Sequence, residues 1–323
     1  MNTLHRIRVV RLKVLKRGSL ASLQPVSELQ LAYTFLDAEI EHPNHLPVAT
    51  SQEQIMSGFD PTIAIKLAED FRALHVPGRP LLLTNVWDPP TAALALRHPE
   101  TKAIATASFA VAAVAGLEDD ELTFEENLGA IRKIAKQLVK DGKASSIPFT
   151  VDMQDGYGAR LEEGIESVIE MGVVGINLED SSCSEGGLKL VDADEHVKRI
   201  RIVMKTAAAK GVPNFVVNAR TDCVLLGGTI DEAIDRGKKY LDAGATTVFV
   251  WGGMKRGLRD AEVAQLVKGL EGRLNVIYRK SMPGALSVKD IGKLGVARIS
   301  MGPGLWRESM RTVEQEISRI LDG

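Results

Sequence analysis

The sequence has few cysteines, no long apolar run and almost no net charge. Its 323 residues include two isolated cysteines, Cys183 and Cys223, which make neither a disulfide framework nor a zinc site, so a reducing compartment is the default. No apolar stretch approaches the roughly 20 residues that a transmembrane helix needs, so we expect no membrane partner. The formal net charge of −2 gives no reason to expect nucleic acid as a partner.

A further absence bears on the fold. No G-x-G-x-x-G motif opens a helix after the first apolar run, which weakens a doubly wound open sheet. From about residue 60, eight short apolar runs alternate with helical patterns: PLLLTNVWD, AIATAS, IPFTVD, VVGINLED, NFVVNAR, ATTVFVWG, LNVIY and VARISMG. Continuous apolar runs are typical of strands covered on both faces, and eight of them in about 240 residues predict a (β/α)₈ TIM-type barrel. The open sheet is the alternative.

The N-terminal segment differs from the rest. MNTLHRIRVVRLKVLKRGSLASLQ is basic, and no acid precedes Glu28. This composition is typical of an organelle transit peptide, with a disordered basic tail or an edge strand as the alternatives. We therefore divide the chain into an N-terminal extension and linker (1–55) and a catalytic barrel (56–323). The expected location is cytoplasmic or mitochondrial, and whether residues 1–27 are cleaved stays open.

Charged side chains stand where the predicted strands end, which is where TIM barrels carry their active sites. The second, third and fourth runs lead to Asp119, Asp152 and Glu179. Carboxylates held close together repel one another unless a cation lies among them, and the absence of clustered His or Cys favours Mg²⁺ or Mn²⁺ over zinc. The fifth run supplies Arg220, whose planar fork suits a carboxylate or a phosphate. Together they predict a metal site for an anionic, oxygen-rich substrate.

Four motifs resemble the isocitrate lyase/phosphoenolpyruvate mutase superfamily, in its phosphonomutase/2-methylisocitrate lyase-like branch. They are GLEDDEL (116–122), VDMQDGYG (151–158), GINLEDS (175–181) and NARTD (218–222), in the family's order. The resemblance implies a (β/α)₈ barrel in a homodimer or homotetramer, with the C-terminal helix exchanged between subunits. It also implies Mg²⁺-dependent making or breaking of a C–C or P–C bond next to a 2-oxo carboxylate or its enolate.

The resemblance assigns the metal ligands residue by residue. Asp152 corresponds to the direct ligand, and Asp119 and Glu179 to carboxylates that hold the metal through water. Gln154 stands where the family often has Asp. Its amide can still accept a bond from metal-bound water, but it removes one negative charge, so we expect Gln154→Asp to tighten metal binding and to weaken binding of an anionic substrate.

The resemblance also implies residues that act on the substrate. The catalytic set is Arg220, Ser108, Glu179 and Tyr157, and the substrate-binding set is Ser108, Phe109, Asn218 and Arg220. Residues 181–190 occupy the position of the mobile loop that closes over the substrate. Other residues have simpler explanations: Asp180 and Asp222 as turn caps, Trp87 and Trp251 as rim packing, and His98 and His196 as solvated helical residues.

Two missing motifs narrow the activity. The chain lacks the Lys-Lys-Cys-Gly-His run of true isocitrate lyases and the Lys- and Asn-bearing loop of phosphonate-forming mutases. We therefore expect a lyase or hydrolase of the 2-methylisocitrate lyase or oxaloacetate hydrolase type, acting through an enolate-like intermediate. The alternatives are phosphonomutase-type P–C chemistry on phosphoenolpyruvate or carboxyphosphonoenolpyruvate, a non-catalytic binding barrel, and an aldolase-like barrel with a phosphate site at SMGPG (300–304).

Overall fold

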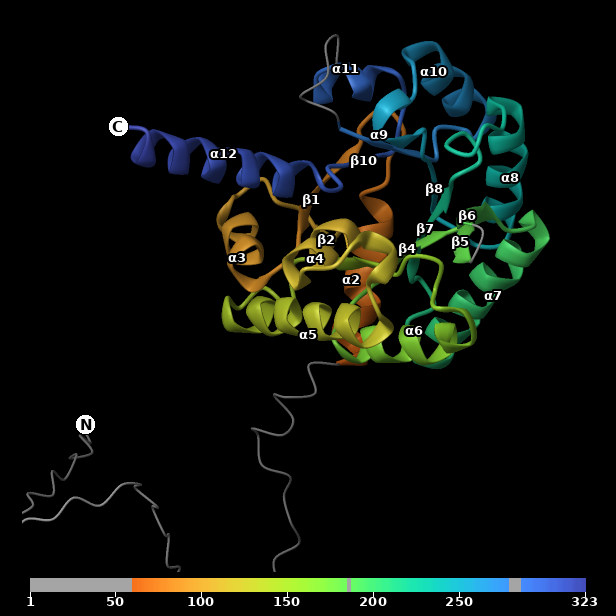
Figure 1. Cartoon of the computed structure of the whole chain (residues 1–323). Helices are drawn as coiled ribbons and strands as arrows, with labels where there is room; N and C mark the ends of the chain where they lie inside the picture. Colours follow the sequence, from red (N-terminus) through yellow and green to blue (C-terminus); the bar gives the residue numbers. More distant parts are fainter. Residues whose placement is uncertain (1–59, 185–186, 279–285) are drawn as a thin grey trace, which may run out of the picture. The chain divides into compact units, whose positions relative to one another are not determined.

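The eight predicted strands form one closed parallel barrel. The computed structural model describes residues 60–184, 187–278 and 286–323. The strands follow the order β1-β10-β9-β8-β7-β4-β3-β2, with helices around them (Figure 1). They are Leu81–Val86 (β1), Ile104–Thr106 (β2), Phe149–Asp152 (β3), Gly175–Glu179 (β4), Val216–Thr221 (β7), Thr247–Val250 (β8), Leu274–Ile277 (β9) and Arg298–Ser300 (β10). The (β/α)₈ barrel is confirmed, and the open sheet is excluded.

The predicted helices are also present, with ends set by local capping. Asp60 accepts hydrogen bonds from the backbone N–H groups of Thr62 and Ile63, and Pro61 occupies the first helical position, where its missing N–H costs nothing. The helices that follow the predicted patterns are Pro61–Ala73 (α2), Pro89–Arg97 (α3), Phe124–Lys140 (α5), Leu161–Glu170 (α6), Ala193–Ala209 (α7), Ile230–Asp242 (α8), Asp260–Gly269 (α10), Val288–Lys293 (α11) and Gly304–Leu321 (α12).

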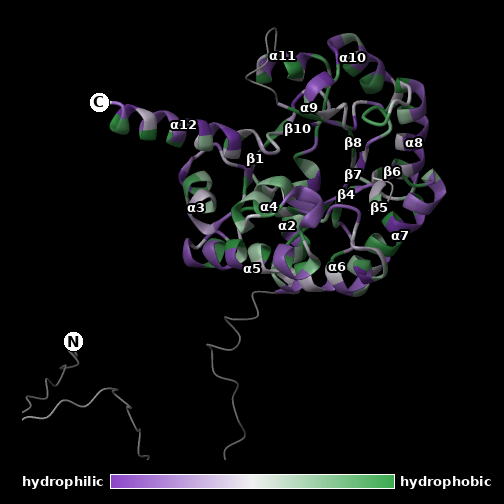
Figure 2. Ribbon diagram, in the orientation of Figure 1, coloured by the Kyte–Doolittle hydropathy of each residue, from purple (hydrophilic) through white to green (hydrophobic). Residues whose placement is uncertain are grey.

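The hydrophobic core lies between the helices and the outer face of the barrel. In α5, Leu128, Ile131, Ile134 and Leu138 recur at helical spacing and are buried. Hydrophobic and hydrophilic positions alternate around the helix ribbons (Figure 2). One hydrophobic cluster connects these helices to the strands, which leaves the inside of the barrel free to carry polar side chains.

The strands place their polar residues inside the barrel. Side chains two residues apart on a strand face the same side. Asn218 and Arg220 of β7 therefore face inward together, while the intervening Ala219 is fully buried in the outer core. The same alternation turns Arg298 and Ser300 of β10 into the barrel. The barrel interior is thus polar toward the carboxyl ends of its strands.

Three elements differ from the sequence prediction. The stretch after the second apolar run, for which the sequence predicts no helix, contains helix Ser108–Ala115 (α4) and a 3₁₀ turn, Asp119–Glu121 (η1). Gly116 ends α4 in the left-handed region, with φ of 79°. The expected closing loop is an antiparallel hairpin of Ser181–Ser184 (β5) and Gly187–Leu190 (β6), whose residues 185–186 lie outside the described residues. A short helix, Gly253–Arg256 (α9), was not predicted.

The C-terminal helix α12 leaves an apolar stripe uncovered. It extends away from the barrel in Figure 1, and none of its residues is buried. Its exposed apolar residues are Leu305, Met310, Val313, Ile317, Ile320 and Leu321. Subunit exchange of this helix stays a prediction, and the predicted boundary at residues 55/56 lies outside the described residues. Within the described part of the chain, no helix has the length and hydrophobicity to cross a membrane.

Candidate active site

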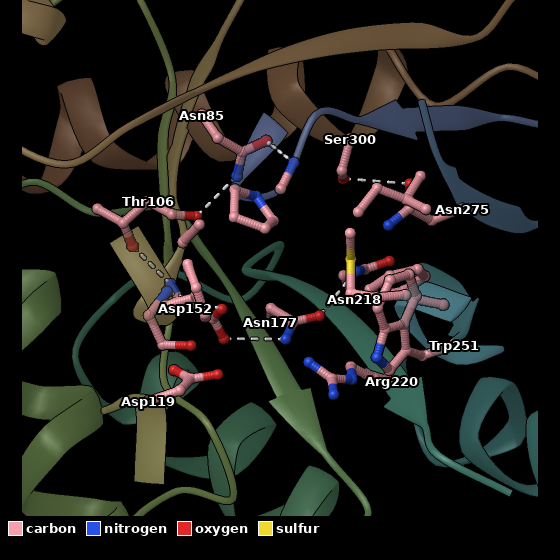
Figure 3. A pocket seen from close by; sticks show the side chains of 18 of the residues that line it. Asn85, Thr106, Asp119, Asp152, Asn177, Asn218, Arg220, Trp251, Asn275 and Ser300 are labelled. Atoms are coloured by element: carbon pink, nitrogen blue, oxygen red, sulfur yellow. Dashed lines mark hydrogen bonds between the residues drawn. The ribbon is translucent and has the colours of Figure 1, made fainter. Parts of the chain in front are cut away.

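A small cavity opens at the carboxyl ends of the strands, where the sequence predicts the active site. Its volume is about 220 Å³, and every strand of the barrel contributes at least one residue to its wall (Figure 3). The strand residues are Asn85, Thr106, Asp152, Asn177, Asn218, Arg220, Phe249, Asn275, Ile277, Arg298 and Ser300. Six of the predicted site residues line it: Ser108, Phe109, Asp119, Asp152, Asn218 and Arg220.

Asp152 is held by hydrogen bonds on both of its carboxylate oxygens. Asn177 Nδ2 donates to Oδ1 at 3.0 Å, and the backbone N–H of Ser108 donates to Oδ2 at 3.1 Å. Asn177 is fixed in turn, because Asn218 Nδ2 donates to its Oδ1 at 2.9 Å. Thr247 Oγ1 donates to Asn218 Oδ1 at 2.7 Å. This chain across β3, β4, β7 and β8 orients Asp152, so Asn218 acts in the structure as a positioning residue.

Asp119 lies beside Asp152 in the cavity wall. Burial and the nearby charge of Asp152 raise its pKa, against a hydrogen bond from Ser108 that lowers it. Gln154 does not line the cavity. Instead its Nε2 donates to the backbone oxygen of Asp119 at 2.6 Å, from a left-handed backbone with φ of 48°. Gln154 therefore positions the η1 turn that carries Asp119.

Arg220 donates hydrogen bonds to two carboxylates. Its Nη1 donates to Glu179 Oε1 at 2.6 Å, and its Nε and Nη2 donate to the two oxygens of Asp222 at 2.8 and 3.1 Å. Burial opposes the charge on Arg220, but Glu179 and Asp222 outweigh it and raise the arginine pKa. Burial raises the pKa of Glu179 well above its usual range, although Arg220 acts in the opposite direction. The guanidinium is therefore a fixed positive charge.

The donor set at Asp152 and Asp119 fits a Mg²⁺ ion held mainly through water. Among the described residues, no group of three His, Cys, Asp or Glu side chains is placed to hold a metal, and Glu179 is engaged by Arg220. Mg²⁺ usually keeps several waters and takes one or two carboxylates. The two adjacent carboxylates, whose charges repel, meet that requirement. Asp152 as direct ligand, with Asp119 and Glu179 acting through water, stays a prediction.

Helix α4 brings its first turn to the cavity. Ala107, Ser108 and Phe109 line the wall, and the N-cap Ala107 offers no side-chain hydrogen bond to the first turn. The amino end of a helix attracts anions. Phe109 contacts Trp306 edge to face, and the guanidinium of Arg307 lies 4.7 Å from its ring centre. Arg307 also lines the cavity, so α12 contributes a further cation to the cavity wall.

Tyr157 and Cys183 are not brought into the cavity. The Tyr157 hydroxyl accepts a hydrogen bond from Asn127 Nδ2 at 2.9 Å, and its ring packs edge to face on Phe124. Burial raises its pKa, which opposes a role as an ionised group. Cys183 is exposed on β5, and partial desolvation, with the nearby charges of Asp120 and Asp155, raises the pKa of its thiol. In this structure Tyr157 thus packs between α5 and the barrel mouth.

Several residues in and around the site have environments that differ from the sequence predictions. Asp180 and Asp222 are fully buried rather than turn caps: Asp222 N–H donates to Asp180 Oδ1, and Tyr240 donates to Asp180 Oδ2. His196, expected in solvent, is fully buried beside Tyr240. Trp251 lines the cavity, while Trp87 packs in a small hydrophobic cluster. In the sequence, the position of Asp222 two residues after Arg220 in NARTD indicates that the two side chains face the same side of the strand.

Comparison with known proteins agrees with this geometry. Residues 71–321 match the phosphoenolpyruvate phosphomutase family. The chain belongs to that family. It is therefore a member of the isocitrate lyase/phosphoenolpyruvate mutase superfamily, as the motifs predict, and an enzyme of the lyase and mutase class. The non-catalytic barrel is not supported.

Three relatives show how far the similarity extends. An uncharacterized protein of Mycobacterium tuberculosis (strain ATCC 25618 / H37Rv) is 31% identical over 78% of this chain and 89% of its own length. The 2-methylisocitrate lyase of Escherichia coli (strain K12) is 30% identical over 55% of this chain and 60% of that enzyme. A solved structure of a phosphonomutase-like protein from Burkholderia cenocepacia J2315 has a TM-score of 0.68 at 30% identity, covering 79% of this chain and 99% of its own.

Proposed function

We propose that this family member cleaves a carbon–carbon bond next to a 2-oxo carboxylate, acting on a small anionic 2-oxo or 2-hydroxy acid, with Mg²⁺ or Mn²⁺ as cofactor. The reaction is of the 2-methylisocitrate lyase or oxaloacetate hydrolase type and passes through an enolate-like intermediate. The supporting observation is the charge arrangement of the cavity, in which the Arg220 guanidinium points toward the carboxylates of Asp119 and Asp152 (Figure 3).

The chain's own residues supply most of what such a cleavage needs. Breaking the bond beside a carbonyl pushes an electron pair onto the carbonyl oxygen, and the fixed positive charge of Arg220 stabilises that oxygen. Mg²⁺, when bound, supplies an electrophile at the same end of the substrate. Phe249 and Trp251 form an apolar wall beside Arg220, which limits the water around the developing charge.

A product screen tests this proposal. Purified protein with Mg²⁺ is incubated with 2-methylisocitrate, oxaloacetate and related 2-hydroxy acids, and pyruvate, glyoxylate and oxalate are measured by proton and carbon NMR. We expect one of these acids to yield product, with turnover abolished by a chelator. Absence of any cleavage product from a folded, metal-loaded protein would contradict the proposal.

Phosphonomutase-type P–C chemistry is the second candidate. The observation that favours it is the match of residues 71–321 to the family described as phosphoenolpyruvate phosphomutase. Incubation with phosphonopyruvate and with phosphoenolpyruvate, followed by phosphorus NMR, separates the two reactions, because only P–C chemistry interconverts these compounds or releases phosphate from phosphonopyruvate. The aldolase-like phosphate site at 300–304 lacks support, because the N–H groups of Met301 and Gly302 both donate to Asn85 Oδ1 at 2.9 Å.

We also infer that the chain is a homodimer or homotetramer in which a second copy covers the apolar stripe of α12. The stripe has no cover within the described residues of one chain, and Val313 and Ile317 are each about half exposed. Light scattering after gel filtration should give a dimer or a tetramer. The pair Val313→Lys and Ile317→Lys should reduce that mass, whereas Glu314→Lys should not. A monomeric wild-type protein would contradict this inference.

The basic N-terminus supports a location in the cytoplasm or in mitochondria as a further proposal. Fusion of residues 1–55 to a fluorescent protein tests it directly. Co-localisation with a mitochondrial marker would favour targeting, and a diffuse signal would favour the cytoplasm. Accumulation in the nucleus or at the cell membrane would contradict both.

A further inference from the structure

The floor of the active-site cavity contains a buried arginine with no anionic partner. Arg298 is the first residue of β10, points into the barrel and is 3% exposed. Its Nε makes a long contact of 3.4 Å to Ser300 Oγ, and its Nη1 is buried without any hydrogen-bond partner. Among the described residues, no carboxylate forms an ion pair with it. Arg220, which lines the same cavity, by contrast forms ion pairs with two carboxylates, Glu179 and Asp222.

An uncompensated guanidinium in this position is costly to the folded protein. Burying a charge without a partner opposes folding, and proteins normally place an anion or several hydrogen bonds beside it. Burial lowers the pKa of Arg298 to about 9, although the charge of Asp152 acts in the opposite direction. The group therefore still carries its proton at neutral pH. Because the unpaired charge of Arg298 opposes folding, its presence indicates that an anionic ligand occupies this site in the functioning protein.

A second unsatisfied donor lies next to Arg298. Asn275 of β9 is in register with Arg298 of β10, so the two residues are neighbours across adjacent strands, which lie about 4.8 Å apart. Asn275 is fully buried and lines the same cavity, and its Nδ2 has no partner, while its Oδ1 accepts a hydrogen bond from Ser300 at 3.2 Å (Figure 3). Two neighbouring donors of this kind match the two oxygens of one carboxylate.

We propose that Arg298 and Asn275 form a subsite for a second carboxylate of the substrate. The substrate is then a dicarboxylate: one carboxylate lies at the Asp152 side, where the bond is cleaved, and the distal one reaches the cavity floor between β9 and β10. This inference rests on the proposed function and narrows its substrate class to acids with two carboxylates. The cavity volume of about 220 Å³ suits so small a ligand.

Ligand binding without turnover tests the subsite. Lactate and malate are 2-hydroxy acids that differ by one carboxylate, so calorimetric titration of both into Mg²⁺-loaded protein isolates its contribution. We expect malate to bind wild-type protein at least ten-fold more tightly than lactate. Arg298→Met should bring the two affinities to within two-fold by weakening malate alone, and Asn275→Leu should reduce the preference several-fold. The exposed Arg201→Met is the matched control and should retain the wild-type ratio.

The outcomes separate this inference from the proposed function. Equal affinity of wild-type protein for lactate and malate, or an unchanged ratio in Arg298→Met, would overturn the subsite and leave the metal-dependent reaction standing. No Mg²⁺-dependent binding of either acid would overturn both. If a buried water is the only occupant of the site, Arg298→Met should leave the ratio of malate to lactate affinity unchanged and should lower the melting temperature. The subsite predicts a ligand-free melting temperature at least equal to wild type, because an unpaired buried charge is removed. If Arg298→Met does not fold, Asn275→Leu decides.

Discussion

Asp222 grips Arg220 with both oxygens of its carboxylate, at 2.8 Å from Nε and 3.1 Å from Nη2. The two residues are two positions apart at the end of β7 and face the same side. Asp222 is itself fixed by Ser181 Oγ at 2.5 Å, at the start of the β5–β6 hairpin. The orientation of Arg220, which points toward Asp119 and Asp152, is therefore set from behind the cavity and is connected to the hairpin.

The first prediction concerns this contact. Asp222→Asn keeps the side-chain shape but removes the charge and one acceptor, so Arg220 loses its fixed direction. A hydrogen bond to a charged group is worth about 1.5–3 kcal/mol, so kcat should fall roughly ten- to hundred-fold while KM changes little. Steady-state kinetics on the best substrate measure it. The exposed Asp235→Asn is the control, and an unchanged kcat in Asp222→Asn would refute the positioning role.

The second prediction separates two neighbouring carboxylates. Asp152 lines the cavity, whereas Asp155 accepts hydrogen bonds from Ser182 Oγ at 2.7 Å and from the Tyr157 N–H at 2.9 Å. Asp152→Ala should therefore abolish Mn²⁺ binding measured by electron paramagnetic resonance, and Asp155→Ala should weaken it far less. Equal losses in the two variants would refute Asp152 as the direct ligand.

The third prediction concerns Gln154, where a hydrogen bond to Asp119 bears on the charge argument made for Gln154→Asp. Its Nε2 donates to the backbone oxygen of Asp119, so an acid at this position would place two acceptors face to face. We expect Gln154→Glu to displace Asp119 and to lower Mg²⁺ affinity several-fold in calorimetric titration. Gln154→Met, which lacks the donor but adds no charge, should lower the affinity less. A higher Mg²⁺ affinity in Gln154→Glu would restore the charge argument.

The fourth prediction links stability to pH through His196. Burial, with nearby Arg199 and Arg236, lowers its pKa from 6.5 to about 3. The unfolded chain therefore binds an extra proton between these values, and the folded protein loses stability as pH falls through that window. The slope is about 1.4 kcal/mol per pH unit for each such histidine.

His196→Leu should remove this contribution, so its free energy of unfolding should depend less steeply on pH between 6 and 4 than that of wild type. Urea unfolding at several pH values measures the slope. The exposed His98→Leu should leave it unchanged. His75, whose pKa burial also lowers to about 3, keeps part of the slope in every variant. An identical slope in wild type and His196→Leu would contradict the assignment.

The sequence predicts the barrel well because each strand is a continuous apolar run bounded by capped helices. It also predicts Asp119, Asp152 and Arg220 at the cavity, because strand ends meet at one rim of a closed barrel. It misses α4, whose residues are apolar on all sides and give no helical periodicity. It also misses the β5–β6 hairpin, because serines and glycines are typical of loops.

The remaining site residues depend on which strands become neighbours in space. Asn177 and Asn218 are 41 residues apart in the chain, and their hydrogen bond exists because β4 pairs with β7 in register. Arg298 stands at the start of β10, whereas the active sites of TIM barrels are expected at the strand ends. Asn275 and Arg298 form a candidate subsite because they are buried side by side and each has a donor atom without a hydrogen-bond partner. No local sequence pattern indicates this.

The role of Asp152 is tested most directly by turnover of the best substrate from the screen by chelator-treated protein, before and after Mg²⁺ is added, with Asp152→Ala in the same assay. We expect no cleavage without metal, recovery of pyruvate, glyoxylate or oxalate production on adding Mg²⁺, and no recovery in Asp152→Ala. Cleavage that persists without metal, or that Mg²⁺ restores equally in Asp152→Ala, would refute the proposal that Asp152 binds the metal for carbon–carbon cleavage.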